Sequence, residues 1–406
     1  MTGPVVRIVV AGGNYAGLNA MQHLYATLLA GDSRPQVRIS LVDRRSGFMH
    51  YVGITRGLAE PDTYGHKLWV PYSTVDWLHH PQIALVQDTV EEIHPHHLVL
   101  GSQRLEFDYL IVALGISRFG PVGVQAASHK EFVEDLRRTH REIASAQTVA
   151  VVGGGAVGVE MAADIKCDFP SKQVTLFHSR ALPIPGPFDD DFRRQTVGIL
   201  HDEIGVAMEL GQRVTHQHPQ SPDMQVEALP ALPESVHSTA TNATLTLADG
   251  RTQTFDWVIR CLGTHDKKHI VHLPSSTDTP IFHTNGIRVR ETMQVDDPLY
   301  PHIYACGDVC DFDQIKLAGM AMYGAHIAAR NIARTITHHK EAKLEPCMRY
   351  PSKMLLLLGK GRFIMQLGDE IWDRDRTAQY VHDDMGLVGC IESLSLDKAP
   401  SATLLD

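Results

Sequence analysis

Short runs of hydrophobic residues recur along this chain, and glycine or a charged residue follows each of them. Four such runs are Val5 to Val10, Val37 to Val42, Asp108 to Val112 and Val149 to Val152. Continuous apolar runs of this length predict strands that are covered on both faces, as in a parallel sheet. Between them lie amphipathic segments such as Leu18 to Leu29, whose spacing predicts helices. The alternation of strands and helices indicates an α/β protein.

The same alternation continues through the rest of the chain. Helices are predicted over Glu131 to Ile143 and over Leu317 to Ile332. Buried strands are predicted over Gln173 to Phe177, Trp257 to Arg260 and Ile303 to Ala305.

Other segments carry weaker patterns. Three short strands of a meander are predicted over Ile83 to Val86, Leu98 to Leu100 and Arg104 to Phe107. An irregular stretch is predicted over Phe48 to Pro71, and a long loop or insertion over Thr215 to Asn242. A hairpin is predicted from Met354 to Leu358 with Arg362 to Leu367, and a disordered tail from Ala399 onward. A further hairpin is expected to turn at Asp249-Gly250.

A glycine-rich turn follows the strand that ends at Val152. Gly153, Gly155 and Gly158 have the spacing of a dinucleotide-binding turn, in which a pyrophosphate rests on the N-terminus of the next helix. Such turns also occur for packing reasons alone, so the spacing by itself is a weak signal. The strand before it and the apolar helix pattern after it favour dinucleotide binding.

A related turn follows the first strand. Gly12, Gly13 and Gly17 occupy it, and Asn14 takes the place of the middle glycine, which weakens the motif. Asp43 ends the next predicted strand, where an acid suits the ribose hydroxyls of an adenosine. The alternative is a solvated acid at the end of a strand. The pair of turns predicts two dinucleotide sites.

Composition narrows the possible functions. A chain of 406 residues is long enough for two or three domains, and its formal charge of −10 without a basic tail argues against a nucleic-acid partner. The six cysteines lack CxxC spacing and suggest a reducing compartment such as the cytoplasm. The histidine pairs His79-His80 and His96-His97 lack metal-ligand spacing, so we expect no metal site. The first strand leaves no room for a signal peptide, and the longest aliphatic run is too short to span a bilayer.

Two turns, two small-residue strand ends and a late Gly-Asp pair form an ordered set. The quoted pieces are LVDRRSGFMH from Leu41, VAVVGGGAVGVEMAADIK from Val149, VTLFHS from Val174 and IYACGDVCD from Ile303. The set resembles the flavoprotein reductases with two dinucleotide-binding domains, and within them the apoptosis-inducing-factor-like and ferroptosis-suppressor-like branch. The likeness covers about Val5 to Ala333.

The resemblance implies two Rossmann-like domains and a small C-terminal α+β segment. It implies an FAD-binding domain over 1–120 and 281–340, an NAD(P)H-binding domain over 121–280, and a segment over 341–406 that covers the flavin and acceptor site. The cofactor-binding residues that it implies are Gly12, Gly13, Asn14, Gly17, Asp43, Arg44, Arg56, Val90, Gly115, Gly307 and Asp308 for FAD, and Gly153, Gly155, Gly158, His178, Arg180 and Gly263 for the nicotinamide cofactor.

Some of these roles are more specific. Asp43 would bind the adenosine ribose, Val90 would flank the adenine, and Asp308 would bind the ribityl chain. Arg56 is a candidate phosphate contact, with a surface arginine as the alternative. Arg180 could pair with a 2′-phosphate, which modestly favours NADPH over NADH, unless it points into solvent.

Two residues are candidates for a part in catalysis. Glu160 matches a family glutamate near the nicotinamide, or it is a first-turn acid that suits the helix dipole. Lys316 precedes a predicted helix whose N-terminus would face the flavin, where a cation would stabilise negative charge. A solvated lysine is an equally good interpretation of Lys316.

The resemblance predicts an FAD-dependent NAD(P)H oxidoreductase. Hydride would pass from the nicotinamide to the flavin and then to a quinone-type acceptor. The alternatives are reduction of a small redox protein and an NAD(P)H-sensing flavoprotein. No cysteine pair has a redox position, so Cys306 and Cys310 are expected to be packing residues. The C-terminal hairpin is expected to shape the acceptor site, either as a core hairpin or through peripheral membrane contact.

Overall fold

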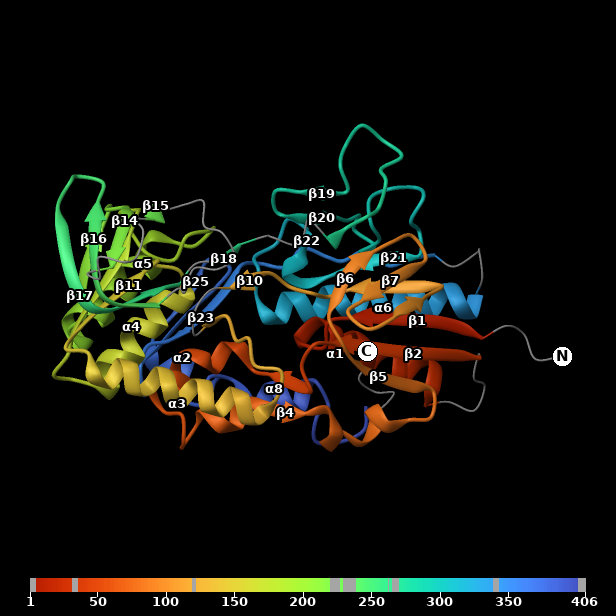
Figure 1. Cartoon of the computed structure of the whole chain (residues 1–406), viewed down its shortest axis with the longest axis horizontal. Coiled ribbons are helices and arrows are strands. Elements are labelled where there is room, and N and C mark those ends of the chain that lie inside the picture. The colour runs from red at the N-terminus through yellow and green to blue at the C-terminus, as the bar shows by residue number, and fades with distance from the viewer. Residues whose placement is uncertain are drawn as a thin grey trace.

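The computed structural model describes residues 5–30, 36–118, 122–219, 227–228, 239–261, 263–264, 270–338 and 343–400. Two sheets with parallel cores lie toward opposite ends of the long axis, and the C-terminal strands run between them (Figure 1). We call the parts built on these sheets the first unit and the second unit. The α/β class predicted from the hydrophobic runs is confirmed.

The first unit is built on a parallel sheet whose central strand is the first apolar run. Its strands, in spatial order, are β21 (Ile303–Ala305), β9 (Tyr109–Val112), β1 (Val6–Ala11), β2 (Val37–Asp43) and β5 (Ile83–Gln87). Ile8 and Val10 in β1 are completely buried because neighbouring strands and helices cover both sides. The Ile83 segment therefore belongs to this sheet, and its prediction as part of the meander was wrong.

Two helices from distant parts of the sequence pack together in the first unit. They are α1 (Tyr15–Leu24), continued by η1 (Tyr25–Leu29), and α6 (Ala318–His338). Buried small residues of α6, among them Gly324, Ala325 and Ala328, allow close approach. α1 begins before the predicted Leu18, because Asn14 caps it.

Smaller elements complete the first unit. The meander is β6 (Val90–Ile93), β7 (His97–Leu100) and β8 (Arg104–Glu106). The stretch predicted to be irregular contains several short elements of its own. These and the remaining pieces are β3 (Gly47–Met49), β4 (Trp69–Pro71), α2 (Ile54–Ala59), η2 (Tyr51–Gly53), η3 (Gly65–Leu68), η4 (Tyr72–Thr74), η5 (Asp76–His79), β19 (Phe282–His283), β20 (Gly286–Arg288), η9 (Gly307–Val309) and β22 (Cys310–Asp311).

The second unit has a mixed sheet. Its described strands, in spatial order, are β13 (Ala207–Leu210), β12 (Gln173–His178), β11 (Thr148–Val152), β17 (Thr252–Arg260), β16 (Thr239–Leu247), β14 (Val214–Pro219) and β15 (Glu227–Ala228). The first four are parallel and the others antiparallel. Strands β14 and β16 occupy both ends of the segment predicted as a loop, so that prediction was wrong there. Its middle, 220–226 and 229–238, lies outside the described residues.

Helices and one strand pair complete the second unit and join it to the first. The helices are α3 (His129–Ser145), α4 (Ala156–Asp168), α5 (Asp190–Gly198) and η7 (Ile199–Ile204). Strand β10 (Ser117–Arg118) leaves the first unit and pairs antiparallel with β18 (Gly263–Thr264), so that Arg118 lies opposite Gly263. The backbone thus connects the two units beside their strand ends.

The C-terminal segment forms a small sheet with two short helices. Its elements are β23 (Lys353–Leu357), β24 (Phe363–Leu367), β25 (Glu370–Trp372), α7 (Arg374–Ala378) and α8 (Leu387–Ser393). Apolar hairpin residues such as Leu356 and Ile364 are buried. The core-hairpin alternative therefore fits, and these side chains are not available to a membrane. Of the predicted tail, residues 401–406 lie outside the described part.

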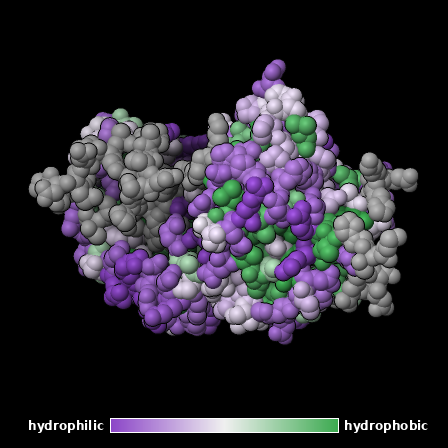
Figure 2. Space-filling view, turned by 45° about the vertical axis from the view of Figure 1, so that its right-hand side comes forward, coloured by the Kyte–Doolittle hydropathy of each residue, from purple (hydrophilic) through white to green (hydrophobic). Residues whose placement is uncertain are grey.

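The outer surface carries hydrophobic residues only in small groups over the part of the chain that the structure describes. The face in Figure 2 is largely hydrophilic, and its hydrophobic residues gather mainly on the right-hand half. Large exposed hydrophobic residues come from separate elements, among them Leu85, Leu299 and Val388. Among the described residues, no helix is both long enough and apolar enough to cross a bilayer.

Candidate active site

A cavity of about 520 Å³ is lined by both units and the C-terminal hairpin. This volume is typical of pockets that bind cofactors or drug-sized ligands, about 300–1,000 Å³. Most of the residues predicted for the flavin side, together with Glu160, line it. They are Gly12, Asn14, Asp43, Arg44, Val90, Gly115, Gly307, Asp308, Lys316 and Glu160.

The first glycine turn packs so closely against neighbouring backbone that it leaves no room for a Cβ at two positions. Gly12 has a φ of +102°, and a Cβ there would lie 2.4 Å from the carbonyl oxygen of Ala113. A Cβ on Gly17 would lie 1.7 Å from the carbonyl oxygen of Gly12. The turn therefore requires glycine at both positions, and it presents the N-terminus of α1 to the cavity, where an anion is favoured.

Asn14 fits the middle position of this turn without strain. Its φ is −99°, so a residue with a Cβ is acceptable. Its Oδ1 accepts a hydrogen bond from the N–H of Tyr15, and its Nδ2 donates to the carbonyl of Met49 at 3.1 Å. The departure from glycine is thus a helix cap that also holds β3.

The acid at the end of β2 fixes the turn. Asp43 is buried, and its carboxylate accepts hydrogen bonds from the N–H of Gly13 at 2.6 Å and of Arg45 at 2.8 Å. Arg44 donates to the carbonyls of Val124 and Gln125, both at 2.6 Å. Asp43 therefore lies where the turn, the strand end and the cavity meet.

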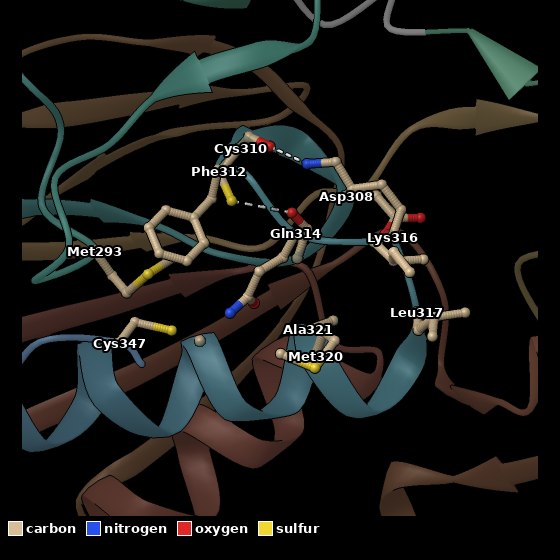
Figure 3. Close-up of a pocket in the computed structure, with 13 residues that line it drawn as sticks. Met293, Asp308, Cys310, Phe312, Gln314, Lys316, Leu317, Met320, Ala321 and Cys347 are labelled. Atoms are coloured by element: carbon tan, nitrogen blue, oxygen red, sulfur yellow. Dashed lines mark hydrogen bonds between the residues drawn. The ribbon is translucent and has the colours of Figure 1, made fainter. Parts of the chain in front are cut away.

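At the other end of the cavity, Asp308 and Lys316 face the start of α6. Asp308 forms an ion pair with Arg118, Nη2 to Oδ2, over 3.0 Å. Lys316 donates to the carbonyl of Cys310, as Figure 3 shows. A second, small cavity of about 20 Å³ adjoins both residues and has room for about one water molecule. Lys316 is therefore a partly buried cation at the edge of the main cavity.

The second glycine turn lies beside the main cavity, and only the helix that follows it reaches in. Gly153 has a φ of +119°, and a Cβ on Gly158 would lie 1.7 Å from its carbonyl oxygen. Gly155 has open space around its Cβ position. Ala156, Val157 and Glu160 of α4 line the cavity.

His178, at the end of β12, holds this second turn through a hydrogen bond. Its Nδ1 accepts the N–H of Gly154 at 3.2 Å, and burial lowers the pKa of its imidazole, which favours the neutral form. His178 therefore has a structural role in the turn, and its contact with the nicotinamide cofactor stays a prediction. Arg180, two residues further on, is exposed. Gly263 lies in β18, opposite Arg118.

Glu160 is a buried carboxyl group at the cavity wall. The N–H of Leu357 in β23 donates to its Oε1 at 3.3 Å. Burial raises the pKa of Glu160 to about 8, although this hydrogen bond acts in the opposite direction. The raised pKa therefore favours the protonated form of this carboxyl group at neutral pH.

Arg56 does not line the cavity, so its predicted contact with a cofactor phosphate does not fit. The guanidinium is buried and forms an ion pair with Asp383 at 2.6 Å, and it also donates to the carbonyl of Gly359 at 3.0 Å. Its Nε lies 3.8 Å from Asp164 of α4. Arg56 instead attaches the C-terminal segment to α4.

Comparison with known proteins shows which family has this architecture. The family model for the pyridine nucleotide-disulphide oxidoreductases matches residues 6–325, most of the chain. The chain belongs to this family. This oxidoreductase is 27% identical to oxidoreductase OXR1 of Ajellomyces capsulatus, with 97% of this chain and 88% of that protein covered. It is 28% identical to mouse ferroptosis suppressor protein 1, with 88% and 87% covered.

Solved structures show the same fold. A ferredoxin reductase from Rhodopseudomonas palustris has a TM-score of 0.64 at 17% identity, with 88% of this chain and 81% of that chain covered. A water-forming NADH oxidase from Lactobacillus brevis, bound to NADH, also has a TM-score of 0.64, with 89% and 74% covered. The predicted class, an oxidoreductase that uses FAD and a nicotinamide cofactor, is confirmed.

The disulphide in the family's name has no counterpart in this oxidoreductase. All six cysteines are free. Burial raises the pKa of Cys310 to about 11 and that of Cys347 to about 12, so neither forms a thiolate readily. Cys306 is also completely buried. Cys310 and Cys347 line the small cavity and Cys306 lines the main one, where they pack in the manner of hydrophobic side chains.

Several residues of the cavity wall were not predicted, among them Arg45, Tyr51 and Arg118. Arg45 directly follows the DR pair at the end of β2, so its position was a usable signal. Arg118 has no such signal, because it meets Asp308 across 190 positions of sequence.

Proposed function

We propose that this oxidoreductase passes electrons from NAD(P)H through FAD to a quinone-type acceptor. One observation carries the proposal: a single cavity is lined by Gly12 and Asp308 of the first unit and by Val157 and Glu160 of the second. Two cofactors bound at the two glycine turns could therefore meet inside one protein-lined space. Close approach of donor and acceptor is the main contribution of the protein to hydride transfer.

The chain offers a binding group for each part of FAD. We assign the FAD-binding domain to 1–120 and 281–340, the NAD(P)H-binding domain to 121–280, and the covering segment to 341–406. The first glycine turn would take the diphosphate, Asp43 the adenosine ribose, Val90 the adenine and Asp308 the ribityl chain. The fit rests on the one cavity that Gly12, Asp43, Val90 and Asp308 line together.

FAD, when bound, supplies the two-electron chemistry that amino-acid side chains lack. The residues of the chain would orient the cofactors, exclude water and hold protons. Met354 and Leu355 of β23 form an apolar wall. The carboxyl of Glu160 holds a proton beside this wall, and Lys316 adds positive charge at the start of α6.

A quinone is the favoured acceptor because the cavity offers no thiol relay. The described cysteines that lie near it are buried and have raised pKa values. A planar acceptor would then take electrons without a protein intermediate. Six free cysteines also support a reducing compartment such as the cytoplasm.

The test is an acceptor screen on the purified protein. It should be yellow and should release FAD on denaturation. NADH or NADPH should bleach the flavin under anaerobic conditions, and a soluble quinone should restore the absorbance faster than oxygen or a disulphide does. Asp308→Ala should lower FAD occupancy, because the ribityl hydroxyls lose a charged acceptor.

Two results would count against the proposal. A colourless protein that cannot be reconstituted with FAD would remove the cofactor assignment. A reduced flavin that persists in the presence of quinones would favour an NAD(P)H-sensing flavoprotein. Rapid turnover only with a small redox protein would favour such a protein as the acceptor.

A further inference from the structure

A row of charged and aromatic side chains crosses the cavity from Asp43 to Asp308. Arg45 Nε lies 3.2 Å from Asp43 Oδ1, and Arg45 Nη1 donates to the hydroxyl of Tyr51 at 2.8 Å. The guanidinium carbon of Arg45 lies 5.5 Å from the centre of the Tyr51 ring, and that of Arg118 lies 6.0 Å from it. Arg118 then reaches Asp308 over 3.0 Å. We call Arg45, Tyr51 and Arg118 the arginine–tyrosine row.

The ends of this row match the two ends of a dinucleotide. Under the proposed function, Asp43 meets the adenosine ribose and Asp308 meets the ribityl chain. In FAD the diphosphate joins these two sugar parts. The cavity between the two acids must then hold the diphosphate, and the two guanidinium groups lie in that part of the cavity.

Charge and hydrogen bonding also fit. A diphosphate in a dinucleotide carries two negative charges, and the row carries two arginines, each of which also pairs with one aspartate. A guanidinium has five N–H donors in a planar arrangement that suits phosphate oxygens. Within the described part of the chain, the Arg118 side chain donates a hydrogen bond to Asp308 through one of its nitrogens. Its side chain is one-third exposed, so it faces the cavity rather than the core.

We propose that Arg118, with Arg45, binds the diphosphate of FAD, in addition to the backbone N–H groups at the start of α1. The inference rests on the proposed function, because it takes FAD as the dinucleotide. Arg118 lies in β10, which pairs with β18 across the junction of the two units. Cofactor binding would therefore also hold the strand pair that joins them.

The test compares flavins with and without a diphosphate. Deflavinated wild type, Arg118→Gln and Arg118→Lys are titrated with FAD and with riboflavin, and the Kd is read from flavin fluorescence. Arg118→Gln should raise the Kd for FAD about tenfold to a hundredfold, the usual loss for a charge-assisted hydrogen bond. The Kd for riboflavin, which has no phosphate, should stay unchanged. Arg118→Lys should retain part of the affinity.

Salt and a matched arginine give two further controls. The dependence of the FAD Kd on salt concentration should be weaker in Arg118→Gln than in wild type, because one cation is lost. Arg104→Gln removes an arginine of β8 that pairs with Glu106 and does not line the cavity, and it should bind FAD as wild type does.

Three outcomes would overturn the inference. Equal weakening of FAD and riboflavin in Arg118→Gln would show that Arg118 only positions Asp308. An unchanged FAD Kd with a raised KM for NADPH would assign Arg118 to the other dinucleotide. Unchanged binding of every ligand would remove its role altogether. If wild type binds no flavin at all, the proposed function itself has failed, which is a separate result. If Arg118→Gln does not fold, the Kd of Arg118→Lys for FAD and its dependence on salt are compared with those of wild type instead.

Discussion

At the scale of single residues, Glu160 is a buried carboxyl group beside the cavity whose pKa the fold shifts. Burial raises its pKa from the usual 4.5 to about 8. Between these two values the folded chain holds a proton that the unfolded chain has released. Folding stability therefore falls as the pH rises from about 4.5 to about 8, and this contribution is fully lost above that range.

Glu160→Gln should remove this penalty. We expect the flavin-free variant to gain stability over wild type, and the gain to be about 2–3 kcal/mol larger at pH 8.5 than at pH 5.5. Urea unfolding at both pH values measures it. Glu392→Gln, at an exposed position in α8, is the control and should show no such difference. A gain that is independent of pH would mean that Glu160 is ionised in the folded protein.

Arg180 is the residue expected to choose between the nicotinamide cofactors. It is exposed at the end of β12, where many NADH-binding domains carry an acid. Arg180→Ala should lower the ratio of kcat/KM for NADPH to kcat/KM for NADH about tenfold, because one charge-assisted contact is lost. Arg194→Ala removes an exposed arginine of the same unit and serves as control. An unchanged ratio would mean that Arg180 points into solvent.

Local motifs explain which site residues the sequence could predict. Gly12, Gly17 and Asp43 act within one strand–turn–helix–strand unit, so their spacing carries the information. The sequence could not predict the ion pairs of Arg56, because its partners, Asp164 and Asp383, come from elements far away in the sequence. Contacts of that kind depend on how the elements pack.

At the scale of elements, Arg56 joins α2, α4 and the C-terminal segment. Arg56→Met leaves the buried Asp164 without its cation and should cost about 3–5 kcal/mol of stability. Asp383→Asn should cost less, because Asp383 is one-third exposed. Thermal unfolding of the two variants gives the order.

A second substitution tests this explanation. Arg56→Met with Asp164→Leu removes both buried charges and should be more stable than Arg56→Met alone. If the double variant is the less stable one, the loss comes from packing around Arg56 rather than from an unpaired carboxylate.

The positions of the strands were easier to predict than the strands with which they pair. The apolar runs at β1, β9, β11 and β21 matched their positions to within one residue, because a strand buried on both faces must be apolar throughout. The composition of the Ile83 run suits an edge strand of a parallel sheet and a meander strand equally well. The sequence therefore could not predict that it pairs with β2. Polar residues in β14 and β16 similarly hid two strands within an apparent loop.

At the scale of the whole molecule, electrons should reach the acceptor without any thiol. We expect a variant with all six cysteines replaced, by Ala where buried and by Ser elsewhere, to reduce quinones at nearly the wild-type rate. The reason is that the three thiols that line the two cavities, Cys306, Cys310 and Cys347, are buried and have raised pKa values. Stopped-flow reoxidation of the FAD-loaded variant measures this.

The comparison needs a folded variant, so FAD content and thermal unfolding are measured first. A folded, FAD-loaded variant whose flavin is still reduced by NAD(P)H but is no longer reoxidised by the quinone would point to a cysteine relay. The proposal of direct transfer would then have to be abandoned.

The first unit is assembled from both ends of the chain, and this has a consequence for synthesis on the ribosome. Strand β21 and helix α6 join β9 and α1 only after about three-quarters of the polypeptide has been made. Trp77 donates a hydrogen bond to the carbonyl of Ser395, and Gln22 to its hydroxyl, near the very end of the described chain. The sheet of the second unit, by contrast, is continuous in sequence. A nascent chain can therefore fold the second unit first, while its N-terminal segment waits for the last residues to emerge.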